Sequence, residues 1–148
     1  MTDASTSIAN LVFAYAERVD LGDFDGVGAL FESATYRAMT GDAIASFTGS
    51  EVAALLRSMV ITGADGTPGT KHVTTNLLIE VDEAAGAATC RSYYTVLQAA
   101  SGPTIRPIIG GRYHDRFERA GGQWRFSDRL IFSDLIGDLS AHLRHNPY

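Results

Sequence analysis

The spacing of the apolar residues changes once along this chain of 148 residues, and the change limits the folds that it can adopt. Up to about residue 60, apolar residues recur every three or four positions, which is typical of amphipathic helices. From about residue 70 to about 133 they recur at every second position, which is typical of strands with one buried face. Helices followed by strands predict an α+β domain whose helices cover one face of an antiparallel sheet.

Three helices and two short strands are expected in the first part. The first helix is expected to end near Asp20, and short strands are expected at 34–39 and 43–48. Side chains that commonly cap helix N-termini precede the three helices: Ser5 or Ser7, then Asp23, then Ser50.

The second part predicts four long strands and a closing helix. The strands are expected at 70–82, 87–99, 105–119 and 123–133. Their separators include Ser101-Gly102-Pro103, and a short helix is expected within 133–143. No linker or internal repeat interrupts the pattern, so we expect one domain over 1–148.

Composition and motifs exclude several classes of function. The chain is 45% hydrophobic and 20% charged, with a net charge of −5 and scattered basic residues, which argues against a nucleic-acid surface. Cys90 is the only cysteine, the start resembles no signal peptide, and no apolar run is long enough for a membrane span. We therefore expect a cytoplasmic protein. Nucleophile-elbow, phosphate-loop, dinucleotide-binding and metal-ligand patterns are absent, so neither cofactor nor metal is expected.

Asp20 and His72 are the candidates for acid–base chemistry. If they meet beside an apolar cavity, the carboxylate keeps one ring nitrogen protonated and leaves the other free to accept a proton. In the strand pattern, His72 shares a face with Thr74, Asn76 and Leu78, a half-polar set that suits a pocket lining. The alternative is a histidine hydrogen-bonded at a strand end and an acid that solvates a helix end.

Other polar residues allow two interpretations each. His114 falls on the outer face of its strand, and His142 and His145 lie in a polar tail, so we set all three aside. Asp128 has the parity of the core residues around it, and Arg129 faces outward unless a bulge turns it inward. The tyrosines are either core aromatics with the hydroxyl at an edge or pocket residues: Tyr15, Tyr36, Tyr93 and Tyr94.

Three stretches of the chain resemble the SnoaL-like branch of the nuclear-transport-factor-2-like (NTF2-like) superfamily: Tyr15–Phe31, Thr70–Glu80 and Ile109–Arg129. The pattern is similar to the subgroup that contains scytalone dehydratase, bile acid 7α-dehydratase and hexachlorocyclohexane dehydrochlorinase. The resemblance implies a conical α+β barrel, with three N-terminal helices packed in a curved, mostly antiparallel sheet. Relatives of this kind form homodimers or homotrimers, so either state is implied here.

The resemblance also implies site residues. Asp20 and His72 match a catalytic aspartate–histidine dyad, and Arg129 matches a pocket arginine of the dehydrochlorinase. Tyr15 stands where that enzyme has a lysine and the bile acid dehydratase a tyrosine, which favours an oxygen leaving group or a carbonyl over chloride. Tyr36 matches a pocket tyrosine of scytalone dehydratase.

The combined expectation is a cofactor-independent lyase of the dehydratase type that acts on a small or medium apolar cyclic compound. An isomerase or cyclase with the same dyad, or a non-catalytic ligand-binding or assembly module of this fold, is the alternative. The expected catalytic residues are Asp20, His72, Tyr15 and Arg129, and the expected substrate-binding residues are Tyr36, Tyr113, Asn76 and Tyr94.

Overall fold

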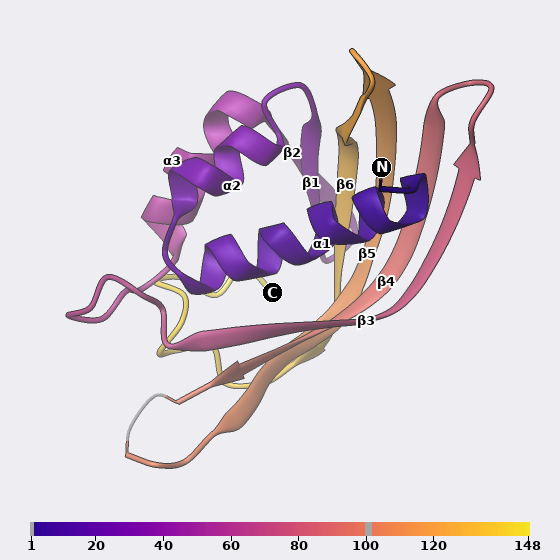
Figure 1. Cartoon of the computed structure of the whole chain (residues 1–148). Helices are drawn as coiled ribbons and strands as arrows, with labels where there is room; N and C mark the ends of the chain where they lie inside the picture. The colour runs from indigo at the N-terminus through magenta and orange to yellow at the C-terminus, as the bar shows by residue number, and fades with distance from the viewer. Residues whose placement is uncertain (1, 100–101) are drawn as a thin grey trace.

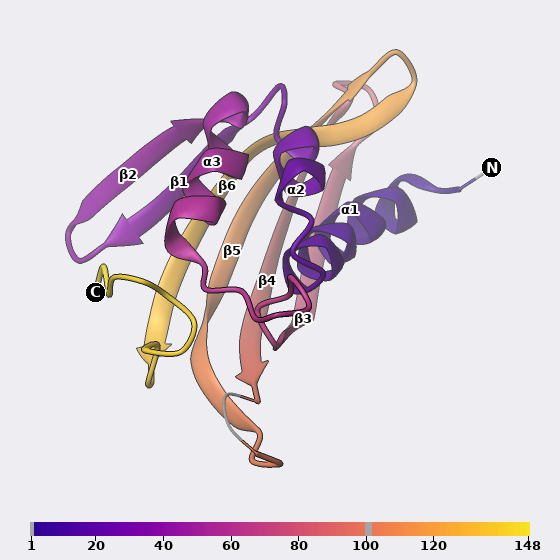
Figure 2. The same ribbon diagram turned by 90° about the vertical axis from the view of Figure 1, so that its left-hand side faces the viewer.

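The structure, a computed structural model, describes residues 2–99 and 102–148. Met1 and the predicted separator residue Ser101 lie outside the described residues. Three helices lie on the concave side of one curved sheet (Figure 1). The sheet forms the back of the molecule in Figure 2. The predicted α+β architecture is confirmed.

The three helices span Ala4–Asp20 (α1), Phe24–Leu30 (α2) and Gly49–Met59 (α3). The cap of α2 is the predicted residue, and the caps of the other two helices lie at least two residues before the predicted ones. Asp3, and neither of the serines after it, caps α1, because its carboxylate accepts the Thr6 N–H at 3.0 Å. Thr48, not Ser50, caps α3, and the Glu51 carboxylate accepts the Thr48 N–H at 2.7 Å. Asp23 caps α2 as predicted.

Six strands form the sheet in the order β2-β1-β6-β5-β4-β3, and only the β1 and β6 pair is parallel. The sheet is strongly curved but does not close, since β2 and β3 are its two edges (Figure 1). The strands are Thr35–Thr40 (β1), Ala43–Thr48 (β2), Thr70–Asp82 (β3), Ala87–Gln98 (β4), Arg106–Ala120 (β5) and Gln123–Ile136 (β6).

The predicted closing helix within 133–143 is wrong. Strand β6 continues to Ile136, which pairs with Ile109 of β5, because the ladder between the two strands supplies backbone partners as far as that residue. The chain then turns and runs back past α3, where Leu143 forms an isolated bridge with Val60. This returning segment, residues 137–148, is called the C-terminal segment below.

Two bulges decide which side chains face the helices. In β3 the register with β4 shifts between Thr75 and Leu78, and Asn76 there has a positive φ of 57°. The shift reverses the predicted parity beyond it, so Leu78 is exposed, although it was expected on the His72 face. In β6 the register with β5 shifts by one residue near Ser127, which brings Arg129 opposite Asp115 and into the interior.

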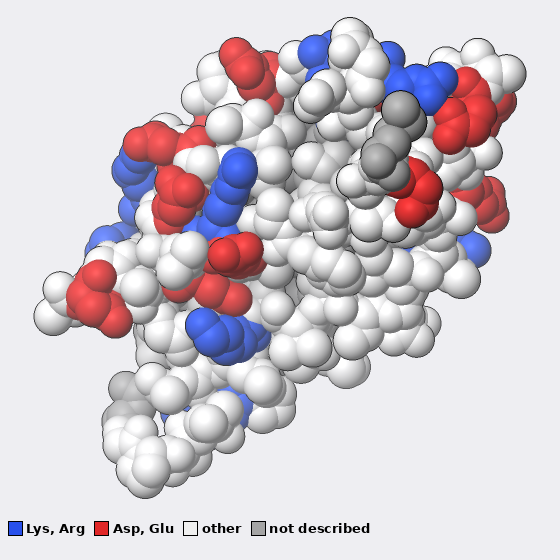
Figure 3. Space-filling model, viewed as in Figure 1, with Lys and Arg blue, Asp and Glu red and all other residues white. Residues whose placement is uncertain are grey.

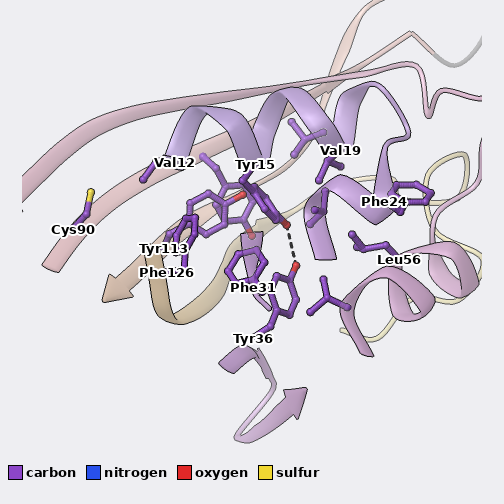
Figure 4. Close-up of a cluster of buried hydrophobic side chains, with 14 of the residues drawn as sticks. Val12, Tyr15, Val19, Phe24, Phe31, Tyr36, Leu56, Cys90, Tyr113 and Phe126 are labelled. Atoms are coloured by element: carbon purple, nitrogen blue, oxygen red, sulfur yellow. Dashed lines mark hydrogen bonds between the residues drawn. The ribbon is translucent and has the colours of Figure 1, made fainter. Parts of the chain in front are cut away.

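Aromatic side chains fill the space between α1, α2 and the sheet. Phe31 packs against Phe126 with ring centroids 4.7 Å apart, and Tyr15 meets the edge of Phe31 at 5.9 Å (Figure 4). This cluster fixes α1 against the sheet, and it thereby sets the position of the last turn of α1, where Asp20 lies. No helix in residues 2–99 and 102–148 is long and apolar enough to cross a membrane.

Candidate active site

The structure brings Asp20, the last residue of α1, against His72, the third residue of β3. The Asp20 Oδ1 atom lies 2.6 Å from His72 Nδ1, and Oδ2 accepts the His72 backbone N–H at 2.8 Å. The Thr70 hydroxyl donates to Oδ1 at 2.8 Å. Both side chains of the dyad are 8% exposed. Residues 52 positions apart in sequence therefore form one rigid hydrogen-bonded unit.

The contacts of Asp20 fix the state of the dyad. Burial alone would raise the pKa of Asp20, but the hydrogen bonds and charge of His72 and the Thr70 hydroxyl outweigh burial and lower that pKa. The carboxylate is therefore ionised and accepts the Nδ1–H bond of His72. In neutral His72 the proton then sits on Nδ1, and Nε2 is left as an acceptor.

The His72 ring opens onto a cavity of about 270 Å³ between α3, the sheet and the C-terminal segment. Most of its wall is apolar, and side chains of α1, α3, all six strands of the sheet and the C-terminal segment contribute to it. The polar side chains in its wall are Tyr15, Tyr36, Thr40, His72, Tyr94, Tyr113, His142 and Tyr148. A few polar groups in an otherwise apolar pocket are typical of a site for a small organic molecule.

Tyr15 and Tyr36 present a shared hydroxyl pair to the cavity. Their oxygens are 2.9 Å apart and buried (Figure 4). Burial raises the pKa of Tyr15 and raises that of Tyr36 well above its ordinary value, so both phenols keep their protons. One proton is used in the bond between the two oxygens, and the second is free to donate to a ligand.

Tyr94 and Tyr113 form another part of the cavity wall. Their rings stack with centroids 4.5 Å apart, and Tyr113 meets the edge of Tyr15 at 5.8 Å. The Tyr94 hydroxyl donates to the Phe132 carbonyl at 3.1 Å and is buried, which raises its pKa. Tyr94 thus offers mainly its ring to a ligand, whereas both faces of the Tyr113 ring are covered, one by Tyr94 and the other by Arg129, so Tyr113 offers only its edge.

Arg129 lies behind the tyrosines and does not line the cavity. Its guanidinium sits 4.3 Å from the Tyr15 ring centroid and 3.8 Å from that of Tyr113. It also makes two hydrogen bonds of 2.8 Å to Asp115, and both side chains are fully buried. Burial alone would lower the pKa of Arg129, but the Asp115 carboxylate outweighs burial and raises it, so the guanidinium is charged.

Two further predicted positions lie away from the cavity. Asn76 faces a separate groove on the outer side of the sheet, beside Arg91, Arg112 and His114. The bulge that gives Asn76 its positive φ is the reason, since it breaks the alternation on which the expectation depended. Asp128 also lies outside the cavity, where its carboxylate accepts two hydrogen bonds from Arg37, at 2.8 and 2.7 Å.

Three polar residues of the cavity wall were not predicted from the sequence, namely Thr40, His142 and Tyr148, and His142 is the one that carries an imidazole. It was set aside as part of a polar tail, yet it is 7% exposed and its ring is part of the cavity wall. The signal that could have found it is the pair of leucines around it, Leu139 and Leu143, which also line the cavity. Among the described residues, no cluster of three or more His, Cys, Asp or Glu side chains is arranged to hold a metal ion.

The sequence profile of the SnoaL-like domain matches residues 1–130. The chain therefore belongs to the SnoaL-like family, as its sequence pattern predicted. No sequence among curated proteins matches this chain.

Solved structures share the fold at low sequence identity. An NTF2-like protein with a cystatin-like fold from Novosphingobium aromaticivorans has a TM-score of 0.71 and 23% identity, over 93% of this chain and 85% of its own. A candidate scytalone dehydratase from the same species has a TM-score of 0.68 and 22% identity, over 90% and 86%. The protein LinA has a TM-score of 0.69 and 20% identity, over 93% and 90%. The fold is thus NTF2-like.

Proposed function

We propose that this protein is a cofactor-independent lyase of the dehydratase type, which acts on a small or medium apolar cyclic compound. The observation that carries the proposal is the 2.6 Å contact between Asp20 and His72 at the wall of an apolar cavity. Similarity to LinA and to the candidate scytalone dehydratase supports the fold and is consistent with this reaction class.

In this reaction His72 is the general base. Its Nε2 atom takes a proton from a carbon of the substrate, and the ionised Asp20 stabilises the imidazolium that forms. The electron pair of the broken C–H bond forms a carbon–carbon double bond, and the neighbouring C–O bond breaks. The leaving hydroxyl takes the proton back from the imidazolium and departs as water.

The Tyr15 and Tyr36 hydroxyls would stabilise the oxygen that gains charge. Because one phenolic proton of the pair is free, it can donate to the leaving hydroxyl or to a carbonyl that becomes enolate-like. Tyr94 would contact the ring system of the substrate through its ring, and Tyr113 would contact it through its edge. Arg129 would act as a positioning residue, since its charge holds the Tyr15 ring and favours negative charge developing near that hydroxyl.

An isomerase or cyclase would begin with the same proton abstraction, so the product mass distinguishes the reactions. The purified protein is incubated with a panel of hydroxylated cyclic ketones, and the products are measured by mass spectrometry. We expect loss of one water from at least one member, and a product of unchanged mass would indicate an isomerase or a cyclase.

One variant and one control test the dyad. We expect His72→Ala to lower turnover by about 10²–10⁴-fold, the usual contribution of a general base. Exposed His145, in the same chain but outside the cavity, supplies the control variant His145→Ala. Unchanged turnover in His72→Ala would contradict the proposed mechanism. Ligand binding without turnover across the whole panel would instead favour a ligand-binding module.

A further inference from the structure

The backbone around His142 is held by contacts from distant parts of the chain. The His142 carbonyl accepts the Ile61 N–H at 2.8 Å, and its own N–H donates to the Leu139 carbonyl at 2.9 Å. The preceding residue, Ala141, accepts a hydrogen bond of 3.1 Å from the Gln98 side chain of β4. The ring is therefore presented to the cavity by a fixed backbone and not by a free chain end.

The His142 ring carries a polar atom that nothing in the described chain satisfies. Its Nδ1 atom is buried and has no hydrogen-bond partner. Two other side-chain atoms share this property, Ser92 Oγ and Arg129 Nη1, but neither residue lines the cavity. Because Nδ1 has almost no accessible surface, a ligand in the cavity cannot reach it. The other ring nitrogen, Nε2, is not among these buried atoms and makes no hydrogen bond to a described residue, so Nε2 is the atom that a ligand can contact.

The ring is also neutral under ordinary conditions. Burial, and then the nearby charge of His72, lower the pKa of His142 to about 4, and the smaller opposing effect of Asp20 does not offset them. A neutral imidazole offers one N–H donor and one acceptor nitrogen and carries no charge. It therefore suits an uncharged hydroxyl or carbonyl and gives little attraction to a carboxylate.

A purely structural role explains these observations less well. The residues beside His142 in the wall are apolar, Leu139 and Leu143 among them, and an apolar side chain would fill the same space with no unsatisfied atom. The imidazole keeps a buried polar atom unpaired, although neighbouring backbone groups pair with one another. The polar ring is accounted for if the occupant of the cavity supplies an oxygen that bonds the accessible Nε2 atom.

We propose that His142 is a substrate-binding residue that contacts a second oxygen substituent of the cavity ligand. The proposal rests on the proposed function, in which the Tyr15 and Tyr36 pair meets the first oxygen. The substrate class is then an apolar cyclic compound with two uncharged oxygen groups, one at the dyad end and one at the C-terminal segment.

Binding of naphthalene probes tests this directly and requires no turnover. Dissociation constants are measured by calorimetry for 2-naphthol, its 6-carboxylate, and the 1,5-, 2,6- and 2,7-dihydroxynaphthalenes. We expect at least one diol to bind the wild-type protein more tightly than 2-naphthol does, and the carboxylate to bind more weakly. His142→Phe should weaken that diol about tenfold, the size of one lost hydrogen bond, and leave 2-naphthol unchanged. His142→Asn, which restores a polar atom, should recover part of the loss.

The proposal is overturned if His142→Phe binds every diol as tightly as the wild type, or if the wild type binds none of the probes. A readout on the unaltered protein covers the case in which His142→Phe does not fold. In ¹⁵N spectra of the four histidine rings, assigned with His72→Ala, His114→Ala and His145→Ala, the diol should shift the His142 nitrogens, and an unchanged signal counts against the contact.

These outcomes are separable from those of the proposed function. His72→Ala should keep the binding of the diol while losing turnover. If His72→Ala instead turns over substrate normally while His142→Phe loses the diol, the lyase mechanism fails and the binding role of His142 stands.

Discussion

The buried pair of Asp115 and Arg129 gives the sharpest test of the structure, because the protein contains a matched pair of the same chemistry nearer the surface. Arg129 and Asp115 make two hydrogen bonds of 2.8 Å with both side chains 0% exposed. Arg37 and Asp128 make two of nearly the same length, 2.8 and 2.7 Å, but their side chains are 30% and 18% exposed. Geometry is thus held nearly constant while burial differs.

We expect Arg129→Met to destabilise the protein by about 3–5 kcal/mol, because it leaves the Asp115 carboxylate buried without its counter-charge. Arg37→Met should lower the free energy of unfolding by about 1 kcal/mol or less, since water reaches this partly exposed pair and solvates the carboxylate that remains. Unfolding of a 148-residue protein carries an entropy of about 0.3 kcal/mol/K. The melting temperature should therefore fall by about 10–16 °C in Arg129→Met and by no more than about 3 °C in Arg37→Met.

Urea unfolding followed by circular dichroism and thermal scanning would measure both differences. The double variant Arg129→Met/Asp115→Leu should be at least as stable as Arg129→Met alone, because it removes the uncompensated charge as well. Equal losses in Arg129→Met and Arg37→Met would refute the reasoning, since burial would then make no difference to the free energy of the pair.

Three further predictions concern Asp20, His142 and Cys90. Asp20→Asn should lower turnover by about 10²-fold or more, because an amide cannot stabilise the imidazolium that His72 becomes; wild-type kinetics would contradict the dyad. Folding stability should fall by about 3 kcal/mol as the pH drops from about 6.5 to about 4, because only the unfolded chain protonates residue 142 in that window. In His142→Phe this part of the pH dependence should vanish, and an unaltered slope in urea titrations would argue against burial of the ring. Burial raises the pKa of Cys90 to about 11, so its thiol should react with Ellman's reagent only after unfolding; fast reaction in the native state would contradict its placement.

Many charged side chains on the surface lie beside a charge of opposite sign. On the face in Figure 3, acidic and basic side chains are interspersed and form no continuous basic patch. Several of the arginines are paired with acids, as Arg112 is with Asp134 and Arg119 with Glu83. Such pairs reduce the positive potential that phosphate binding requires.

Most of the strand boundaries were predictable to within three residues, since alternation of apolar and polar residues is a direct consequence of one buried face. The pairing of Asp20 with His72 was predictable only through the family resemblance. Nothing in the local sequence indicates that the end of α1 meets the start of β3. Two of the three helix caps lie at least two residues before the predicted ones, because several neighbouring side chains at each N-terminus can accept the same N–H bonds.

The faces of individual side chains were harder to predict at the bulges. An extra residue in one strand moves every later side chain to the opposite face, and the extra residue is visible only against the partner strand. This is why Asn76 points away from the cavity. The shift near Ser127 likewise turns Arg129 inward, to a place behind Tyr15 and not in the cavity wall.

By itself, the sequence determined the kinds of elements, their order and the residue types available for acid–base chemistry, because these depend on local spacing and on side-chain identity. Only the tertiary structure decided which of these residues share one cavity. His142 enters it because Ile61 and Gln98, from distant parts of the chain, hold the backbone of the C-terminal segment. The composition of the site depends on these long-range contacts, and such contacts leave no periodic signal in the sequence.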